Sequence, residues 1–160
     1  MEFNIATWNV RSTLQTGKME EITDELKKYN IQITALQEVR WTHDGWIKNR
    51  NYTLLYSGLK TSKGQHGTRF LITGCATQCI IRFEPINERM CKLRIKSKFY
   101  NMTVISVYAA TEDENKRNAD DLERFYSNLS DVCDKKPRND SLSLLGDFNE
   151  KSGKNIQAEE

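Results

Sequence analysis

The sequence predicts an α/β domain with strand–helix–strand units at both ends of the chain and antiparallel strands in the middle. Apolar segments rich in aliphatic and β-branched residues occur at residues 3–9, 31–38, 102–109 and 142–149, as expected of buried strands. A segment with helical periodicity separates the first two, and another separates the last two. Strand–helix–strand repeated in this way indicates two crossover units with parallel strands.

The two helical segments each carry one apolar stripe. Apolar side chains recur at intervals of three and four in residues 18–30 and in residues 114–136, and Pro137 follows the second segment. These intervals place apolar side chains on one face of a helix, and proline is typical just past a helix end. The stripes comprise Met19, Ile22, Leu26 and Tyr29 in the first segment, and Ala119, Leu122, Phe125, Leu129 and Val132 in the second.

Short alternating runs of polar and apolar residues occupy residues 52–107. Such alternation predicts strands with one buried and one exposed face. In the clearest run, Cys91, Leu93, Ile95 and Phe99 alternate with Lys92, Arg94, Lys96 and Lys98. We therefore expect an antiparallel meander here, with one apolar and one basic face, and mixed sheets overall.

Length and composition suit one intracellular domain. The chain has 160 residues, of which 38% are hydrophobic, and 24 Lys and Arg against 22 Asp and Glu leave a net charge of +2. This balance permits a local nucleic-acid-binding patch without arguing for one. No apolar run approaches the roughly 18 residues of a membrane span, and the N-terminus lacks a secretory signal. We expect no membrane association, a nuclear or cytoplasmic location, and four reduced cysteines.

Polar residues that can hold a metal ion or a phosphate stand at the ends of all four predicted strands. They are Asn9, Gln37 with Glu38, Tyr108, and Asp147 with Asn149. Ligands bind beyond the carboxyl ends of parallel strands in open α/β sheets. A glutamate beside an asparagine offers the oxygen ligands that Mg²⁺ prefers, and a second carboxylate can orient or deprotonate a water. Amide and phenol groups can donate to phosphate oxygens, so metal-assisted phosphodiester hydrolysis would use every member.

Each of these residues also has an ordinary structural explanation. Asp147 can form an Asx-turn after Gly146, and Glu38 can be a surface acid near Arg40. Tyr108 can be a core aromatic with its hydroxyl at the rim. The residues alone leave both interpretations open. Serine-hydrolase and P-loop chemistry are excluded, because neither Gly-x-Ser-x-Gly nor the P-loop motif occurs.

Four motifs resemble, in order and spacing, those of the endonuclease/exonuclease/phosphatase superfamily. They are TWNV at 7–10, ALQEVRW at 35–41, VYAATED at 107–113 and LLGDFN at 144–149. The chain is similar, over nearly its whole length, to the apurinic/apyrimidinic-type endonuclease domains of non-LTR retrotransposons and to craniofacial development protein 2-like proteins. The resemblance implies a four-layered α-β-β-α sandwich with two mixed sheets. It also implies an Mg²⁺-dependent phosphodiesterase, with Mn²⁺ as a substitute, that acts on DNA as an endonuclease.

The resemblance implies a role for each matched residue. Glu38 corresponds to the main Mg²⁺ ligand, with Asn9 beside it in the metal and phosphate site. Tyr108 corresponds to the phosphate-facing tyrosine, Asp147 to the acid that positions the attacking water, and Asn149 to the amide that holds the scissile phosphate. The candidate catalytic residues are thus Tyr108, Asp147 and Asn149, the candidate substrate-binding residues Asn9, Tyr108 and Asn149, and the candidate metal ligands Glu38 and Asn9.

The family domain continues past the Gly-Asp-Phe-Asn motif to a further aspartate and an Asp-His motif. We therefore expect a partial domain at 1–151, incomplete at its C-terminus, and a tail at 152–160. Neither His43 nor His66 corresponds to the family's histidine, so we expect weak or no catalysis. We expect no obligate protein partner, although exposed sheet surface could support self-association. Arg69 stands where the family often has a small residue, and a buried arginine must find a partner or reach water.

An alternative function is a non-catalytic nucleic-acid-binding remnant of a retroelement endonuclease. Its surface would draw on Lys60, Lys63, Lys92, Arg94, Lys96 and Lys98. A solvated sheet face would contain the same residues. The sequence also leaves the substrate open between abasic DNA, target-site DNA, RNA and other phosphoesters.

Overall fold

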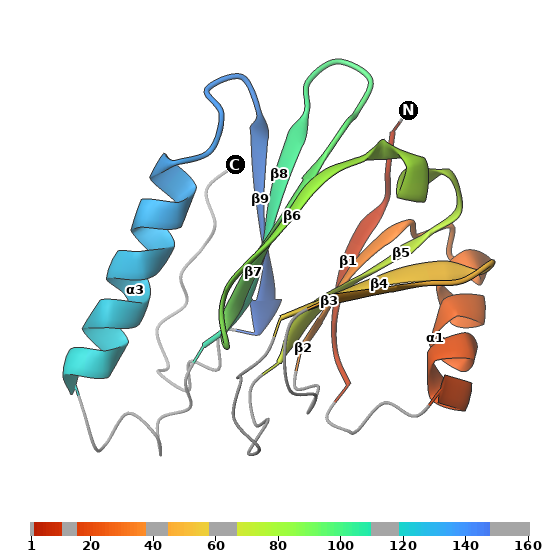
Figure 1. Ribbon diagram of the computed structural model, residues 1–160, viewed down its shortest axis with the longest axis horizontal. Helices are drawn as coiled ribbons and strands as arrows, with labels where there is room; N and C mark the ends of the chain where they lie inside the picture. The colour runs from red at the N-terminus through yellow and green to blue at the C-terminus, as the bar shows by residue number, and fades with distance from the viewer. Residues whose placement is uncertain (1, 11–15, 38–44, 58–66, 110–118, 148–160) are drawn as a thin grey trace.

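The computed structural model describes residues 2–10, 16–37, 45–57, 67–109 and 119–147. Two mixed sheets lie face to face, with α1 against the outside of one and α3 against the outside of the other (Figure 1). The predicted α-β-β-α sandwich is therefore confirmed. Neither helix in the described ranges has the length and apolar character that a membrane span requires.

The first sheet has five strands in the order β1-β2-β5-β4-β3. β1 (Ile5–Asn9) and β2 (Ile33–Gln37) run parallel, and α1 (Thr16–Lys28) connects them, which confirms the first crossover unit. β5 (Thr68–Thr73) pairs antiparallel with both β2 and β4 (Tyr52–Ser57), and β3 (Gly45–Lys48) completes the edge. The sequence did not predict β3, because this short strand is largely exposed and lacks a clear alternation.

The second sheet has four strands in the order β6-β7-β8-β9. β6 (Ile80–Asn87), β7 (Met90–Ile95) and β8 (Met102–Tyr108) are antiparallel neighbours. α3 (Ala119–Asp134) connects β8 to the parallel strand β9 (Ser141–Asp147), which confirms the second crossover unit. A 3₁₀ helix, η1 (Gly74–Cys79), carries the chain from β5 to β6. The middle of the chain is thus divided between the two sheets instead of forming one continuous meander.

The main core lies between the two sheets and has a smaller cluster beneath each helix. Burial of apolar surface here supplies most of the driving force for folding. The inter-sheet core includes Ile33, Phe70, Leu93 and Val104; the cluster under α1 includes Met19, Ile22, Leu26 and Leu71; and the cluster under α3 includes Ile105, Val107, Phe125 and Leu129. The helical stripes are confirmed at these positions.

Two residues that the sequence pattern assigned to an apolar, buried face are exposed, so these two predictions are wrong. Tyr29 is 68% exposed because α1 ends at Lys28, so the stripe stops before it. Phe99 is 74% exposed because β7 ends at Ile95 and the alternation has no strand to continue. A repeat of apolar residues predicts the buried face of a helix or strand only over the residues that belong to that helix or strand. The side chain of Ala119 lies outside the described residues.

Arg69 is buried in β5, with 1% of its surface exposed. It does not reach water, and its guanidinium carbon lies 5.7 Å from the ring centroid of Tyr56 on the neighbouring strand. Desolvation by burial lowers the pKa of Arg69 to about 9, and the charge of Tyr56 opposes that shift. The cation is thus held against an aromatic ring, where the ring quadrupole compensates part of the lost hydration.

Asp140 anchors the start of β9 to its neighbour β8, through Thr103, and to β7 beyond it, through Arg94. Its carboxylate accepts hydrogen bonds from Arg94 Nε at 2.7 Å, from Arg94 Nη2 at 2.9 Å and from the Thr103 hydroxyl at 2.8 Å. The hydrogen bonds from Arg94 lower the pKa of Asp140, and the hydrogen bond from Thr103 acts in the same direction against the cost of burial. This forked ion pair holds the beginning of the strand that ends at Asp147.

We expect Asp140→Asn to destabilise the domain in a pH-dependent way. The folded-state pKa of Asp140 lies below the unfolded value of about 3.9, so its contribution is complete above about pH 5. That contribution is lost as the pH falls through the folded-state pKa. Urea unfolding at neutral to acidic pH should therefore show a difference in the free energy of unfolding between the native and variant proteins. This difference should narrow below about pH 4. The exposed control Asp24→Asn should show no such difference; a difference independent of pH would contradict this explanation.

Candidate active site

The candidate site lies at the carboxyl ends of four strands, where the two sheets face each other. β1 and β2 end at the paired residues Asn9 and Gln37, and β8 and β9 end at the paired residues Tyr108 and Asp147. β1 packs against β9, and β2 packs against β8 and β9. All four ends lie at the lower side of the view in Figure 1. The topology therefore brings the expected strand ends together.

The structure describes part of the set of site residues. Asn9 is half-buried and Tyr108 is buried, while Asp147 is described as the last residue of β9. Glu38 and Asn149 lie outside the described residues, although each follows closely on a described strand end. The strand register thus brings three of the five positions to one end of the sandwich.

Gln37 joins the two sheets next to this end. It is 1% exposed; its Oε1 accepts a hydrogen bond from the Thr7 hydroxyl at 3.2 Å, and its Nε2 donates to Ser106 Oγ at 3.5 Å. Thr7 lies on β1 and Ser106 on β8, so one buried amide connects three strands. These bonds hold the end of β2, the strand that directly precedes Glu38 in the sequence. Sequence reasoning missed Ser106, although strand alternation places it on the face of Tyr108.

Arg89 is a second residue that sequence reasoning missed. Its guanidinium carbon lies 5.7 Å from the Tyr108 ring centroid, and the Tyr108 N–H donates to the Arg89 carbonyl at 2.8 Å. Tyr108 is 5% exposed, so its ring is a packed aromatic, as one of the two interpretations expected. An arginine at this place can also supply donors to a phosphate. No local signal marks it, because Arg89 belongs to the turn between β6 and β7.

Gly146 is a strand residue and does not form the turn that the sequence also allowed. It pairs with Val107 inside β9 and has a φ of +156°. A Cβ atom here would lie 2.8 Å from the carbonyl carbon of Val107 and closer still to its oxygen. Only glycine lets the backbones of β8 and β9 approach so closely. The glycine of the LLGDFN motif therefore sets the position of the strand end beside Tyr108.

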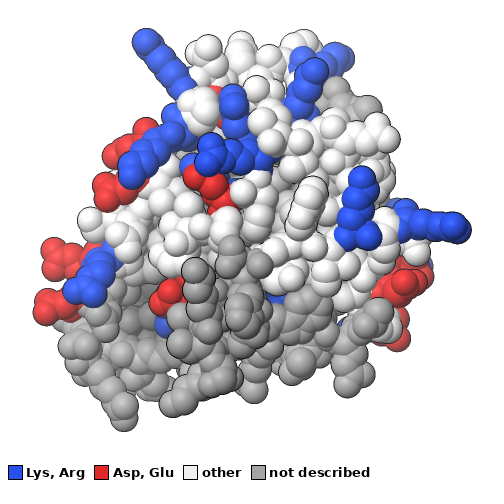
Figure 2. Space-filling model, viewed as in Figure 1, with Lys and Arg blue, Asp and Glu red and all other residues white. Residues whose placement is uncertain are grey.

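Ion pairs neutralise Lys92 and Arg94 on the basic face of the second sheet. Lys92 Nζ lies 2.8 Å from a Glu84 oxygen, and Arg94 forms the fork with Asp140. Figure 2 shows basic and acidic side chains next to each other on the side of the molecule that faces the viewer. Lys96 and Lys98 are exposed. Lys60 and Lys63 lie outside the described residues.

The match to known families covers most of the chain. Residues 6–155 match the Endonuclease/Exonuclease/phosphatase family. The chain belongs to this family. The chain is similar to craniofacial development protein 2 from Bos taurus and from Tragulus javanicus. Each is 32% identical to it over 152 residues, which is 95% of the chain. The chain spans 25% and 26%, respectively, of the length of these relatives.

Solved structures of other proteins share the fold. The endonuclease domain of TRAS1, a telomere-specific non-LTR retrotransposon, has a TM-score of 0.66 at 16% identity, covering 94% of this chain and 61% of that chain. The 3′ phosphatase NExo from Neisseria, bound to a product DNA hairpin, has a TM-score of 0.67 at 20% identity, covering 92% and 58%. These two structures support the fold, and the family match over residues 6–155 confirms the superfamily resemblance.

Proposed function

We propose that residues 1–151 form part of a domain that hydrolyses phosphodiester bonds in DNA with the help of Mg²⁺. This proposal depends on one observation: the two parallel strand pairs, β1–β2 and β8–β9, end on the same side of the sandwich. The motifs that resemble those of the family lie at these strand ends in the sequence. Family membership supports a phosphodiesterase or nuclease-like chemistry. A DNA substrate is supported by the structural neighbour from Neisseria, which contains a product DNA hairpin.

The donor set of the candidate site suits a hard divalent cation. In our proposal Glu38 and Asn9 hold the cation through carboxylate and amide oxygens, which Mg²⁺ prefers. When bound, the ion would neutralise charge on the phosphate and on the leaving oxygen. Mn²⁺ should replace it, because both ions accept such ligands.

The remaining residues act on the water and the phosphate. Asp147 orients or deprotonates the attacking water, and Asn149 donates its amide hydrogens to the scissile phosphate. The Tyr108 hydroxyl donates to a phosphate oxygen, and the neighbouring Arg89 adds positive charge on the same side. Gln37 positions the metal-binding strand end by holding β2 against β8. Together these groups would hold the metal ion, bind the phosphate and position the attacking water.

A purely binding role has less support. Two of the basic residues that it would use, Lys92 and Arg94, already pair with carboxylates. Binding to nucleic acid would have to break or share those ion pairs, so few counterions would be released. We also propose that residues 1–160 alone turn over slowly, because they span 61% of the TRAS1 endonuclease domain with which they align.

A plasmid-nicking assay tests the proposal, because a single cut in a supercoiled circle is detectable even when turnover is slow. We expect relaxed circles to accumulate with Mg²⁺ or Mn²⁺ and not with EDTA. Plasmid with and without abasic sites, compared in parallel, would reveal the substrate preference. Absence of nicking by a protein that unfolds cooperatively on heating would contradict hydrolysis by this chain. Nicking that persists in EDTA would contradict the metal requirement.

A further inference from the structure

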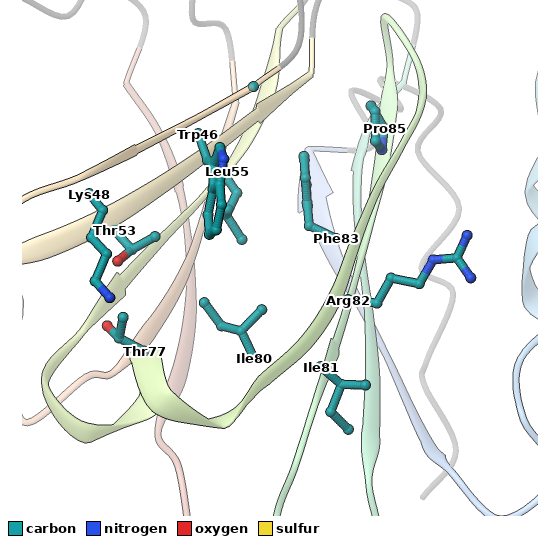
Figure 3. A pocket seen from close by; sticks show the side chains of 11 residues that line it. Trp46, Lys48, Thr53, Leu55, Thr77, Ile80, Ile81, Arg82, Phe83 and Pro85 are labelled. Atoms are coloured by element: carbon teal, nitrogen blue, oxygen red, sulfur yellow. The ribbon is translucent and has the colours of Figure 1, made fainter.

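A cavity of about 410 Å³ opens between the two sheets, beside strands that do not carry the candidate active site. Its walls come from β3 and β4 on one side and from η1 and β6 on the other (Figure 3). β3 and β6 are edge strands, whereas the candidate active site uses β1 and β9 at the opposite edges. The cavity therefore belongs to a different part of the sandwich.

Most of the cavity wall is apolar. It is formed by Trp46, Leu55, Ile80, Phe83 and Pro85. Trp46 is 68% exposed, an unusual state for so large an apolar side chain, and Leu55 is buried behind it. A concave apolar surface of this volume is typical of a small-molecule site. Filling it would remove the exposed face of Trp46 from water.

One end of the cavity is polar. Thr53 is 1% exposed, and its hydroxyl oxygen has no hydrogen-bond partner among the residues that the structure describes. Buried hydroxyl groups nearly always have a partner, so this donor is available to a ligand. Lys48 pairs with Thr53 in strand register, and Figure 3 shows its ammonium group and the hydroxyls of Thr53 and Thr77 at the same end. Among the described residues, Lys48 forms no ion pair.

We propose that this cavity binds a small amphipathic anion, namely a carboxylate with an apolar body. The apolar body would lie against Trp46, Leu55 and Phe83. Its single negative charge matches the Lys48 ammonium, and its oxygens would accept hydrogen bonds from Thr53 and Thr77.

Other ligand classes fit the cavity less well. A phosphate ester would bring more charge than one ammonium balances, since Arg82 points away from the cavity (Figure 3) and lies 3.5 Å from Glu84. A nucleobase would leave its polar edge unpaired against the apolar wall. A cation with an apolar body would be repelled by the ammonium group of Lys48. The site is therefore selective for a monoanion and independent of the proposed nuclease activity.

Calorimetric titration of the 160-residue chain with decanoate tests the proposal, with decanol and decyltrimethylammonium as matched probes. We expect saturable binding of one decanoate per chain, weaker binding of decanol and none of decyltrimethylammonium. Lys48→Met keeps the apolar stem and should weaken decanoate roughly tenfold. Thr53→Val keeps the shape and should weaken it several-fold. Lys27→Met, which removes an exposed charge of α1 away from the cavity, should change nothing.

Backbone amide shifts in NMR spectra locate the bound probe. Decanoate should shift amides of residues 45–55 and 77–85 and leave those at Asn9, Gln37 and Tyr108 unchanged. Three results would overturn the proposal: equal affinity of the native protein and Lys48→Met, tighter binding of the cationic probe, or shifts confined to β1 and β9. Thermal unfolding of each variant shows that it is folded, so that a lost affinity reports on the cavity.

Discussion

Gly146→Ala is expected to lower the free energy of unfolding by about 3–5 kcal/mol, because the added Cβ has no space. It would stand 2.8 Å from the carbonyl carbon of Val107 and closer to the oxygen, and both are backbone atoms that cannot rotate away. The φ of +156° adds strain for any residue with a side chain. The end of β9 would have to separate from β8, which also displaces Asp147.

Gly17→Ala is the matched control for this prediction. Gly17 lies in α1, and nothing stands within 4 Å of the position that its Cβ would take. Alanine favours the helix over glycine by up to about 1 kcal/mol, so the same chemical change should stabilise the protein here. Urea unfolding followed by tryptophan fluorescence measures both variants. If Gly146→Ala unfolded at the same urea concentration as the native protein, the pairing of β8 and β9 would not depend on the close approach of their backbones.

Glu38→Gln is expected to reduce plasmid nicking by ~10³-fold and to weaken Mn²⁺ binding at least about tenfold. Glutamine keeps the size of the side chain and removes the charge that a divalent cation prefers. Asp147→Asn should reduce nicking by ~10²–10⁴-fold, since it removes the group that orients or deprotonates the water. Its effect on Mn²⁺ affinity should be much smaller. The two carboxylates are therefore distinguishable by metal binding.

Electron paramagnetic resonance of Mn²⁺ provides the second measurement, because it follows metal binding without any turnover. Glu20→Gln removes an exposed carboxylate of α1 and should leave both nicking and metal affinity at native values. Unchanged Mn²⁺ affinity in Glu38→Gln would place the metal elsewhere. Native nicking rates in both Glu38→Gln and Asp147→Asn would exclude the proposed mechanism altogether.

The sequence by itself determined the elements that frame the candidate site. Apolar runs located β1, β2, β8 and β9 to within two residues at each end, and the helical periods located α1 and α3. The parallel pairing followed from the same patterns, because a strand–helix–strand crossover returns the chain in its original direction. Such features depend on neighbours close in sequence, so a single chain is enough to predict them.

Only the tertiary structure decided how these elements meet. Gln37 lies two residues after Ala35, on the face of β2 that packs into the inter-sheet core, but its bond to Ser106 spans 69 positions in sequence. In the same way, the sequence assigns Arg94 to a basic face, whereas in the structure Asp140 neutralises it. The sequence also allows Gly146 to be a turn residue, whereas in the structure it lies against β8. A pattern within one strand specifies which face is buried and not what it is buried against. That choice depends on the packing of the whole chain, which is why contacts between distant segments were missed.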